Sequence, residues 1–427
     1  MASTNPARGM RDFLPADVRK REYVIGVIKS VYESYGFEPL ETPAVENLDT
    51  LTGKYGDEGN QLIFKILKRG EKLDDSLRRP DKPDADSREN LADLALRYDL
   101  TVPLARVVAN SRDKLPKFFK RYQIQPVWRA DRPARGRFRE FYQCDVDVIG
   151  SESMVVEAEI IAAASEILTR LGFDDFIVRV NHRELLSKMV ADADIENESE
   201  ALIALDKLDK IGADGVRTEL ISRGIAGAAA DKFLASVLGT TSNEKLDELV
   251  TLCGSARIRI DPSLARGLSY YTGTIMEINV PDLAGSLGGG GRYDGLIGMF
   301  GKEQIPACGF SLGLERILVV MDERGMFPPE IAESAAADVL VTIWSDETAA
   351  ESLKLAQELR SAGFRVTLYP QMDKEDKQWK YANSIGVSWI CTVNETDLGE
   401  GMVSFQNLVT RERFREPRPD VASKLGT

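Results

Sequence analysis

One stretch of the chain, "LARGLSYYTGTIMEI" (residues 264–278), sets a single arginine, Arg266, beside two tyrosines and a threonine. A guanidinium stays charged and presents its donors in a planar fork that matches phosphate and carboxylate groups. The adjacent Tyr270 and Tyr271 supply aromatic surface together with hydroxyl groups that can donate or accept hydrogen bonds. A plain core strand needs neither feature, so the stretch predicts a pocket in which Arg266 binds an anion.

A second group of polar side chains lies within the predicted strand 138–149, "FREFYQCDVDVI". Because strand side chains alternate between faces, Gln143, Asp145 and Asp147 share one face, and Gln143 and Asp147 lie about 13 Å apart. Acceptors at that separation could bind the two ends of a polar zwitterion. The alternative is a half-exposed strand with ordinary polar residues, and the strand taken alone favours it.

The loop before that strand, "RADRPARGR", is strongly basic. Its four arginines are Arg129, Arg132, Arg135 and Arg137. One interpretation is a solvated hairpin tip. The other is that Arg129, at the strand end, binds a phosphate while the basic tip reaches nucleic acid.

A glycine-rich stretch, "GSLGGGGRYDG", leads into "IPACGFSLGLERILVV". It matches neither the dinucleotide-binding fingerprint nor the P-loop, and alone it indicates a mobile or closely packed backbone. The segment after it predicts a strand and a glycine turn feeding a helix, with Arg316 in the first turns. Helix N-termini favour phosphates, so Arg316 is a candidate phosphate ligand. The alternative for this region is a surface ion pair of Glu315.

Asp99 and Thr101 in "LRYDLTVPLARVVA" precede a helix predicted to begin near Pro103. Either side chain could cap that helix. Capping accounts for one of them and leaves the other for a ligand amine.

The elements that must position these residues fall into two parts. We expect residues 1–330 to form a first domain, with a charged helical insertion at about 188–254. Residues 331–337 form a linker. From Asp338 onward, β and α patterns alternate, which predicts a small doubly wound α/β domain over residues 338–427.

Composition narrows the function classes. The 427-residue chain has a net charge of −13, which argues against a general coat for nucleic acid but leaves room for a local basic patch. The four cysteines form no CxxC pair and predict buried thiols, and the single His182 excludes a histidine cluster for metal. The sequence contains no long apolar run and no apolar signal core at its start, so we expect a cytoplasmic protein that does not enter a membrane.

Taken together, these segments resemble the histidyl-tRNA synthetases, a family of class II aminoacyl-tRNA synthetases, over nearly the whole chain. "GFEPLETPAVE", "VWRADRPARGRFREFYQCDVDVIG" and "GFSLGLERI" are similar to the three class motifs. The specific resemblance is "ARGLSYYTGTIME", together with "LRYDLT" and "GGGRYDGL". Ser269 stands where the family usually carries aspartate.

The resemblance implies an α+β catalytic domain on an antiparallel sheet, a helical insertion and a C-terminal α/β anticodon-binding domain. It implies that Asp99, Thr101 and Gln143 hold the amino and carboxylate end of histidine. Asp147 and Tyr271 would bind the imidazole, with Tyr270 packing beside them. Arg129 and Arg266 would contact the α-phosphate of ATP, and Arg316 its tail.

The activity implied is that of an ATP-dependent ligase which makes histidyl-adenylate and transfers histidine to tRNA(His). ATP, Mg²⁺, L-histidine and tRNA(His) are the implied ligands, with no metal-binding side chains assigned, and the implied assembly is a homodimer. The alternative is a catalytically silent paralogue, either a regulatory subunit of ATP phosphoribosyltransferase or a sensor of uncharged tRNA.

Overall fold

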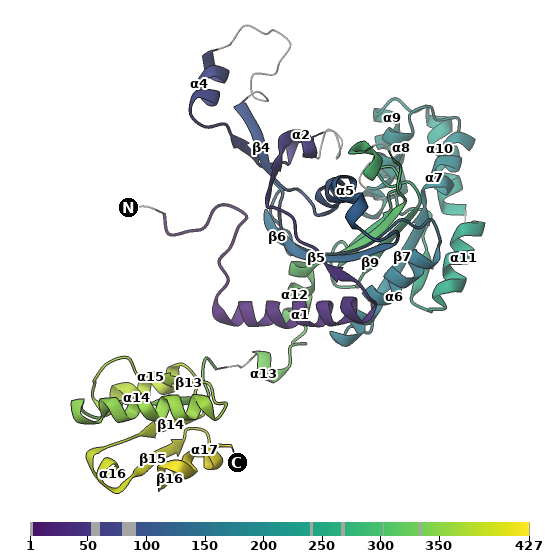
Figure 1. The fold of residues 1–427 in the computed structure, drawn as a ribbon. Helices are drawn as coiled ribbons and strands as arrows, with labels where there is room; N and C mark the ends of the chain where they lie inside the picture. The colour runs from purple at the N-terminus through teal and green to yellow at the C-terminus, as the bar shows by residue number, and fades with distance from the viewer. Residues whose placement is uncertain are drawn as a thin grey trace. The chain divides into compact units, whose positions relative to one another are not determined.

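The computed structural model describes residues 3–52, 60–78, 91–239, 242–265, 270–301, 303–332 and 335–426. The chain divides into two compact units, Met1–Phe327 and Pro328–Thr427, and each is described by itself (Figure 1). Within the described ranges, no helix is both long enough and apolar enough to cross a membrane. All four cysteines are unpaired thiols; Cys253 is half-buried and the other three are buried.

The first unit is built on an eight-stranded sheet in the order β1-β5-β6-β11-β10-β9-β7-β8. Its strands are β1 (Glu38–Pro39), β5 (Phe119–Trp128), β6 (Glu140–Ile149), β7 (Ile177–His182), β8 (Ile258–Ile260), β9 (Thr274–Asn279), β10 (Gly288–Arg292) and β11 (Ala307–Gly313). Every neighbouring pair is antiparallel except β1–β5 and β7–β8 at the two edges. The expected α+β domain on an antiparallel sheet is therefore confirmed.

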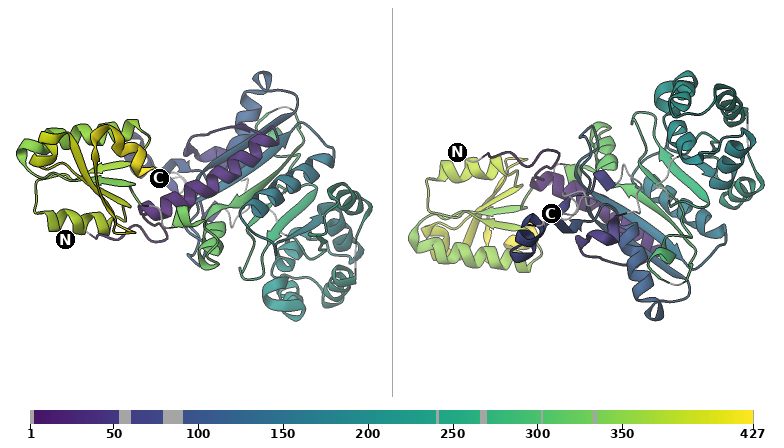
Figure 2. Two further views of the ribbon diagram at one scale, coloured as in Figure 1. Left: turned by 90° about the horizontal axis from the view of Figure 1, so that it is seen from below. Right: turned by 90° about the horizontal axis from the view of Figure 1, so that it is seen from above.

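Three helices cover one face of this sheet: α1 (Pro15–Ser34), α6 (Val155–Arg170) and α12 (Leu314–Glu323), as Figures 1 and 2 show. The apolar stripe of α1, which includes Val24, Ile28 and Val31, is fully buried. The helix ends before Gly36, whose φ of 76° lies in the left-handed region that glycine adopts without strain. These helices bury the second face of β6, so the half-exposed strand of the alternative interpretation is wrong.

The opposite face of the sheet carries α5 (Thr101–Asn110), around which the strands curve in Figure 1. A small antiparallel sheet, β2-β4-β3, lies in the same region of the chain, formed by Val45–Asn47, Ala92–Leu96 and Lys65–Leu67. Short α2 (Leu48–Leu51) packs on it. The connection from β3 to β4 includes α4 (Glu71–Arg78) and is the charged stretch of the sequence; residues 79–90 lie outside the described ranges.

A group of helices follows β7 and gathers at the β7–β8 end of the sheet (Figure 2). Its members are α7 (Arg183–Asp192), α8 (Glu198–Leu205), α9 (Leu208–Ser222), α10 (Gly227–Gly239) and α11 (Glu244–Cys253). Asn197 and Asn243 cap α8 and α11 through their side-chain oxygens. The lone His182 is buried and caps α7, its Nδ1 accepting from Glu184 N at 3.2 Å. Burial lowers the pKa of His182, which favours the neutral ring that this cap needs.

The second unit holds a five-stranded sheet in the order β13-β12-β14-β15-β16. Its strands are β12 (Val339–Val341), β13 (Val366–Leu368), β14 (Trp389–Thr392), β15 (Met402–Asn407) and β16 (Arg413–Pro417). One apolar core joins the sheet to α14 (Asp346–Ser361) and α17 (Val421–Leu425), and the other joins it to α15 (Glu375–Ser384). Helices on both faces confirm the doubly wound prediction. The antiparallel β15 and β16, with α16 (Glu395–Glu400), extend beyond the predicted β-α-β-α-β run.

Candidate active site

The centre of the large sheet presents one polar face. Gln143, Asp145 and Asp147 of β6 lie opposite Gln125, Gln123 and Arg121 of β5. On the other side, β11 places Gly313, Ser311 and Gly309 opposite the same three residues of β6. Long polar side chains therefore come from β5 and β6, and the small residues of β11 leave room for them.

Asp147 is held by groups from two other elements. Its Oδ2 lies 2.7 Å from Arg121 Nη2, and its Oδ1 accepts a hydrogen bond from the Tyr293 hydroxyl. Asp147 is 2% exposed and Arg121 is fully buried. A carboxylate held by one ion pair and one hydrogen bond has a defined orientation, as a group that selects a ligand requires.

Burial sets the electrostatics of this face. It raises the pKa of both Asp145 and Asp147 above the ordinary value, and the positive charge of Arg121 acts in the opposite direction on both. Asp145 Oδ2 is 4.0 Å from Arg121 Nη2, farther than Asp147. Of the two carboxylates, Asp147 is therefore the better stabilised as an anion.

Tyrosine rings surround the Asp147 end of the face. Tyr270 packs edge-on against Tyr271, with ring centres 5.2 Å apart, and against Tyr293 at 6.0 Å. Tyr270 Oη also lies 3.5 Å from Asp99 Oδ2. Burial raises the pKa of the Tyr271 hydroxyl, which therefore stays protonated and can donate a hydrogen bond. The structure thus brings Tyr270, Tyr271, Asp99 and Asp147 close together, and their role toward a substrate stays a prediction.

Asp99 and Thr101 lie at the start of α5, which begins two residues before the predicted Pro103. Asp99 takes the capping role, because its Oδ1 accepts from Val102 N at 3.0 Å. Its other oxygen, Oδ2, faces Tyr270. Thr101 is the first residue of the helix and its side chain is half-buried.

The glycine-rich stretch forms strand β10, and its glycines make space for the site. A Cβ on Gly291 would lie 3.1 Å from a Tyr271 ring carbon. A Cβ on Gly309 of β11 would lie 1.8 Å from Asp147 Oδ1, which no side chain could tolerate without moving Asp147. The glycines are therefore required by the close approach of two site residues rather than by a phosphate loop.

Arg129 lies near the other end of the polar face. Its Nε donates to Tyr98 O at 3.0 Å, and its guanidinium lies over the rings of Tyr98 and Phe141, 4.3 and 5.2 Å from their centres. Since Tyr98 precedes Asp99 and Phe141 shares the face of Gln143, Arg129 borders the site. Two aromatic rings hold the cation in place while it stays partly accessible to a phosphate.

Arg316 is the third residue of α12, as predicted, and its Nη1 donates to Ser286 O. A Cβ on Gly313, which pairs with Gln143, would lie 3.6 Å from Arg316 Cδ. Arg316 therefore borders the Gln143 end of the polar face, as Arg129 does. Two arginines thus lie at the end remote from Asp147.

Glu315, next to Arg316, does form an ion pair, with Arg11 Nη2 3.9 Å from its Oε1, but Glu315 is buried and the surface pair of the alternative interpretation is wrong. Its Oε1 and Oε2 accept from Tyr142 N at 3.1 and 3.0 Å, and burial raises the pKa of Glu315 to about 7. Because α12 packs on β6, its second residue points into the core rather than to solvent.

The basic loop tip between β5 and β6 is tied to its own unit. Arg135 Nε donates to Glu323 Oε1 at 2.9 Å and its Nη1 donates to Asp282 O at 3.0 Å, while Arg137 lies 3.4 Å from Asp131. Arg132 is exposed at the same tip. These contacts give the tip a defined conformation, and its role toward nucleic acid stays a prediction.

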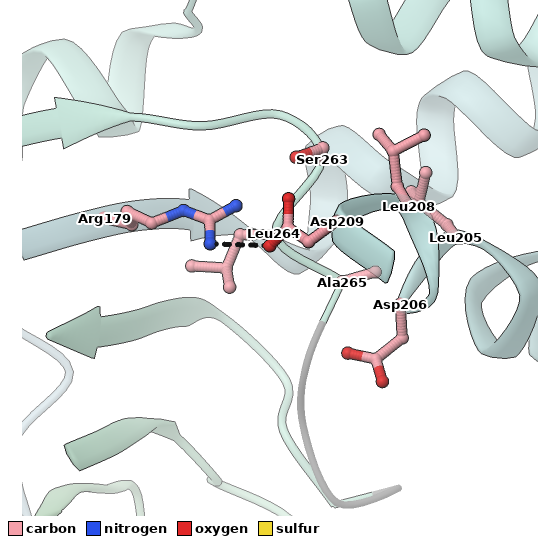
Figure 3. Close-up of a pocket in the computed structure, with 8 residues that line it drawn as sticks. All are labelled: Arg179, Leu205, Asp206, Leu208, Asp209, Ser263, Leu264 and Ala265. Atoms are coloured by element: carbon pink, nitrogen blue, oxygen red, sulfur yellow. Dashed lines mark hydrogen bonds and ion pairs between the residues drawn. The ribbon is translucent and has the colours of Figure 1, made fainter. Parts of the chain in front are cut away.

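Arg266 and Ser269 lie outside the described residues, which stop at Ala265 and resume at Tyr270. A small polar cavity borders the residues that precede this gap (Figure 3). It is lined by Arg179, Leu205, Asp206, Leu208, Asp209, Ser263, Leu264 and Ala265. Arg179 Nη1 lies 2.9 Å from Asp209 Oδ2, a pair that joins β7 to α9 of the insertion. Among the residues that the structure describes, no predicted substrate residue lines this cavity.

Two residues that hold Asp147 were missed by the sequence reasoning. Tyr293 stands inside the quoted "GGGRYDGL", and Arg121 follows from the alternation of β5 once its register against β6 is known. Only the strand pairing shows that Arg121 faces Asp147. The described residues contain no group of three or more His, Cys, Asp or Glu side chains able to hold a metal ion.

An antiparallel sheet with an arginine directly after the first strand of its central hairpin, and with a neighbouring strand that runs into a helix carrying a second arginine, is typical of the catalytic domain of class II aminoacyl-tRNA synthetases. The first unit belongs to that class. Comparisons with known proteins narrow the assignment.

A family model described as "Histidyl-tRNA synthetase" matches residues 9–79 and 83–317, and one described as "Anticodon binding domain" matches residues 338–427. The chain is 40% identical to a histidine–tRNA ligase of Cytophaga hutchinsonii, over 98% of each chain. It is 41% identical to a histidine–tRNA ligase of Porphyromonas gingivalis, over 96% of each. The chain belongs to the histidyl-tRNA synthetase family and is an aminoacyl-tRNA ligase.

Solved structures agree on the fold. A histidyl-tRNA synthetase from Nostoc sp. PCC 7120 matches with a TM-score of 0.75 and 29% identity, covering 100% of this chain and 99% of that one. A Bacillus halodurans structure titled as an ATP phosphoribosyltransferase regulatory subunit/histidyl-tRNA synthetase matches with a TM-score of 0.71 at 21% identity, covering 92% of this chain and 100% of that one. At that identity only the fold is shared. The regulatory alternative is not favoured, because the relatives near 40% identity over almost the full chain are ligases.

Proposed function

We propose that this chain activates L-histidine with ATP and transfers the histidyl group to tRNA(His), using the polar face of β6 as the substrate site. The observation that supports this proposal is the spatial order of the side chains along that face. An oriented carboxylate and tyrosines lie at the Asp147 end, and two arginines border the Gln143 end. An aromatic amino acid with a polar ring fits the first end, and phosphates fit the second.

At the first end, Asp147 and Tyr271 bind the imidazole of histidine, and Tyr270 packs beside it. A buried site that hydrogen-bonds a substrate N–H can reject analogues lacking it by about 10⁴-fold, because its own polar groups are then left unpaired. This selectivity requires no editing step.

In the middle of the site, Asp99, Thr101 and Gln143 bind the amino and carboxylate groups of histidine. Gln143 Nε2 donates to Ser311 Oγ at 3.0 Å, and its Oε1 is buried with no hydrogen-bond partner. An unpartnered buried carbonyl is costly, and a substrate ammonium would satisfy it.

At the phosphate end, Arg129 and Arg266 contact the α-phosphate of ATP and Arg316 contacts its tail. The histidine carboxylate attacks the α-phosphorus in line and pyrophosphate leaves. The terminal ribose hydroxyl of tRNA then attacks the carbonyl carbon of the adenylate, and AMP leaves. Because the histidine carboxylate and the ribose hydroxyl are the nucleophiles, no nucleophilic side chain is needed. The arginines stabilise the charge that spreads over the phosphoryl oxygens.

Mg²⁺ belongs to this proposal as an ion that arrives on the phosphates of ATP, because it keeps several waters and is often held through substrate phosphates. The described residues offer no cluster of carboxylates for it, so no side chain is assigned to it. It would neutralise phosphate charge.

The remaining assignments rest on family membership. Residues 1–330 form the catalytic domain with the insertion at about 188–254, residues 331–337 are a linker, and residues 338–427 bind the tRNA anticodon. The active form is a cytoplasmic homodimer.

The test is ATP–pyrophosphate exchange by the full chain with each amino acid in turn. Exchange should depend on histidine, and a second assay should show charging of tRNA(His). A chain that makes no histidyl-adenylate would be the silent paralogue.

Arg266→Ala should slow adenylate formation by about 10²- to 10³-fold, because it removes a charge from the transferring phosphate. Wild-type-like exchange in that variant would remove Arg266 from the mechanism.

A further inference from the structure

Beneath the proposed imidazole end, one buried cation faces two buried carboxylates. Arg121 is fully buried, Asp145 is 1% exposed and Asp147 is 2% exposed. Arg121 Nη2 lies 2.7 Å from Asp147 Oδ2 and 4.0 Å from Asp145 Oδ2. The set carries an unbalanced negative charge when both acids are ionised.

A purely structural role explains this arrangement poorly. Burying charges costs several kcal/mol per ion, and apolar residues of similar volume often stabilise an interior as well or better. A second carboxylate beside one cation adds a like-charge repulsion. Asp145 Oδ1, Asp147 Oδ2 and Arg121 Nε have no hydrogen-bond partner among the described residues, so hydrogen bonds within the protein satisfy these buried groups only in part.

Arg121 also contacts the segment at the other side of the substrate. Its Nη2 donates to Leu100 O at 3.4 Å, and Leu100 separates Asp99 from Thr101. Its Nη1 donates to Gln123 Oε1 at 3.2 Å, on the same strand. One guanidinium therefore links the Asp147 carboxylate to the loop that carries Asp99 and Thr101.

We propose that Arg121 is a positioning residue for histidine specificity, which keeps Asp147 ionised and oriented toward the substrate imidazole and aligns the Asp99–Thr101 segment. Arg121 itself touches no substrate. This inference rests on the proposed function, in which Asp147 accepts from the imidazole N–H.

The choice between the two acids follows from geometry. Asp147 has the short contact to Arg121 and the hydroxyl of Tyr293, whereas Asp145 is farther from the cation. When two carboxylates share a buried site, one of them tends to hold a proton. Because Arg121 lies closer to Asp147, it stabilises the negative charge there, and the charged Asp147 accepts a hydrogen bond from the imidazole N–H.

The experiment measures pyrophosphate exchange by full-length variants with histidine and ATP varied separately. Arg121→Met should raise the KM for histidine by about 10- to 100-fold, because Asp147 loses the partner that keeps it charged. The KM for ATP should stay within about twofold, because Arg129 and Arg316 are untouched. Arg121→Lys, which keeps the charge but not the fork, should raise the histidine KM less than Arg121→Gln.

Lys120→Gln is the matched control. Lys120 is the residue of β5 before Arg121 and points to the other face, where its Nζ lies 2.8 Å from Glu159 Oε1 and donates to Tyr35 O at 2.6 Å. Losing this cation should leave both KM values unchanged. Thermal unfolding of every variant separates loss of fold from loss of binding.

An unchanged histidine KM in folded Arg121→Met overturns the proposal, as does an equal rise in the two KM values. If Arg121→Met does not fold, the order of Arg121→Lys and Arg121→Gln decides, and equal histidine KM values in those two overturn it. Failure of the proposed function gives a different result: pyrophosphate exchange by the unaltered chain would then not depend on histidine.

Discussion

The two units of this protein place their charges differently. In the catalytic unit, Arg121 and Asp147 form an ion pair in the interior of a sheet, with side-chain exposures of 0% and 3%. In the C-terminal unit, Arg365 and Asp338 form an ion pair with exposures of 55% and 35%. Both pairs are close contacts, but only the first is removed from water.

The difference reflects what each unit has to recognise. A small polar ligand must exchange its water for protein groups, so its partners lie in the interior at a cost that packing elsewhere offsets. A macromolecule is recognised over an outer surface, which does not require both charges of a pair to be buried. In the C-terminal unit the carboxylate of Asp397 is buried, but its partner Arg415 is 43% exposed. The two apolar cores of the C-terminal unit include Val339 and Leu355 in one, and Leu340 and Ile390 in the other.

The largest effect is expected from removing residues 338–427, which tests whether the two units recognise different ligands. Charging of tRNA should fall by about 10²- to 10⁴-fold, the range by which a second binding module raises avidity. Histidine-dependent pyrophosphate exchange should persist, because every described site residue and its supporting core lie in the first unit. Unimpaired tRNA charging would show that the second unit has another role.

Two glycine-to-alanine substitutions, one in each unit, test whether only the first unit affects histidine binding. Gly309→Ala places a Cβ 1.8 Å from Asp147 Oδ1, so Asp147 must move and the histidine KM should rise by at least about 100-fold. Gly399→Ala in α16 meets nothing within 4 Å, and it should leave both KM values unchanged while stabilising the chain by up to about 1 kcal/mol.

Steady-state exchange kinetics and thermal unfolding measure the two effects. If Gly309→Ala keeps the histidine KM of the unaltered chain, Asp147 does not bind the imidazole. A large loss from Gly399→Ala would instead place that helix in a contact outside the described structure.

The smallest expected effect is in the pH dependence of stability. Burial raises the pKa of Glu315 to about 7, so the folded state holds a proton that the unfolded chain has released. The contribution of Glu315 to stability should therefore fall as pH rises from the ordinary glutamate value toward 7, by at most about 1.4 kcal/mol per pH unit. Urea denaturation of the unaltered chain and of Glu315→Gln measures this, and the variant should have a smaller slope, with the remainder contributed by Asp145 and Asp147, whose pKa values burial also raises.

Asp338 in the C-terminal unit should act with the opposite sign. Its hydrogen bond with Arg365 lowers the pKa of Asp338, so its stabilising effect is present above the ordinary aspartate value and is lost as pH falls through the lowered pKa. Asp338→Asn should therefore leave the slope between pH 5 and 7 unchanged, within about 0.3 kcal/mol per pH unit. Equal slopes in Glu315→Gln and the unaltered chain would show that Glu315 is ionised throughout.

Short-range pattern was sufficient for several parts of the site. The two-residue period of the strand placed Gln143 and Asp147 on one face, and the strand–glycine–helix pattern placed Arg316 in the first turn of α12. The tyrosine pair was recognised from its local sequence alone. Each of these features depends on residues that are close together in the chain, where backbone geometry limits the options.

The partners of those residues came from distant segments. Arg121 and Tyr293 reach Asp147 from positions 26 residues before it and 146 residues after it, and only strand register brings them there. The same holds for Glu315, which a surface interpretation placed in solvent until the packing of α12 on β6 buried it.

The sequence by itself therefore determined the fold class and the family, and it supplied most of the residues of the proposed site, because these follow from local periodicity and from motifs read along the chain. Only the tertiary structure decided which carboxylate is held by Arg121 and which glycines must stay small. Those properties depend on the register between strands and on the helices that cover them, and neither is specified by a single stretch of sequence.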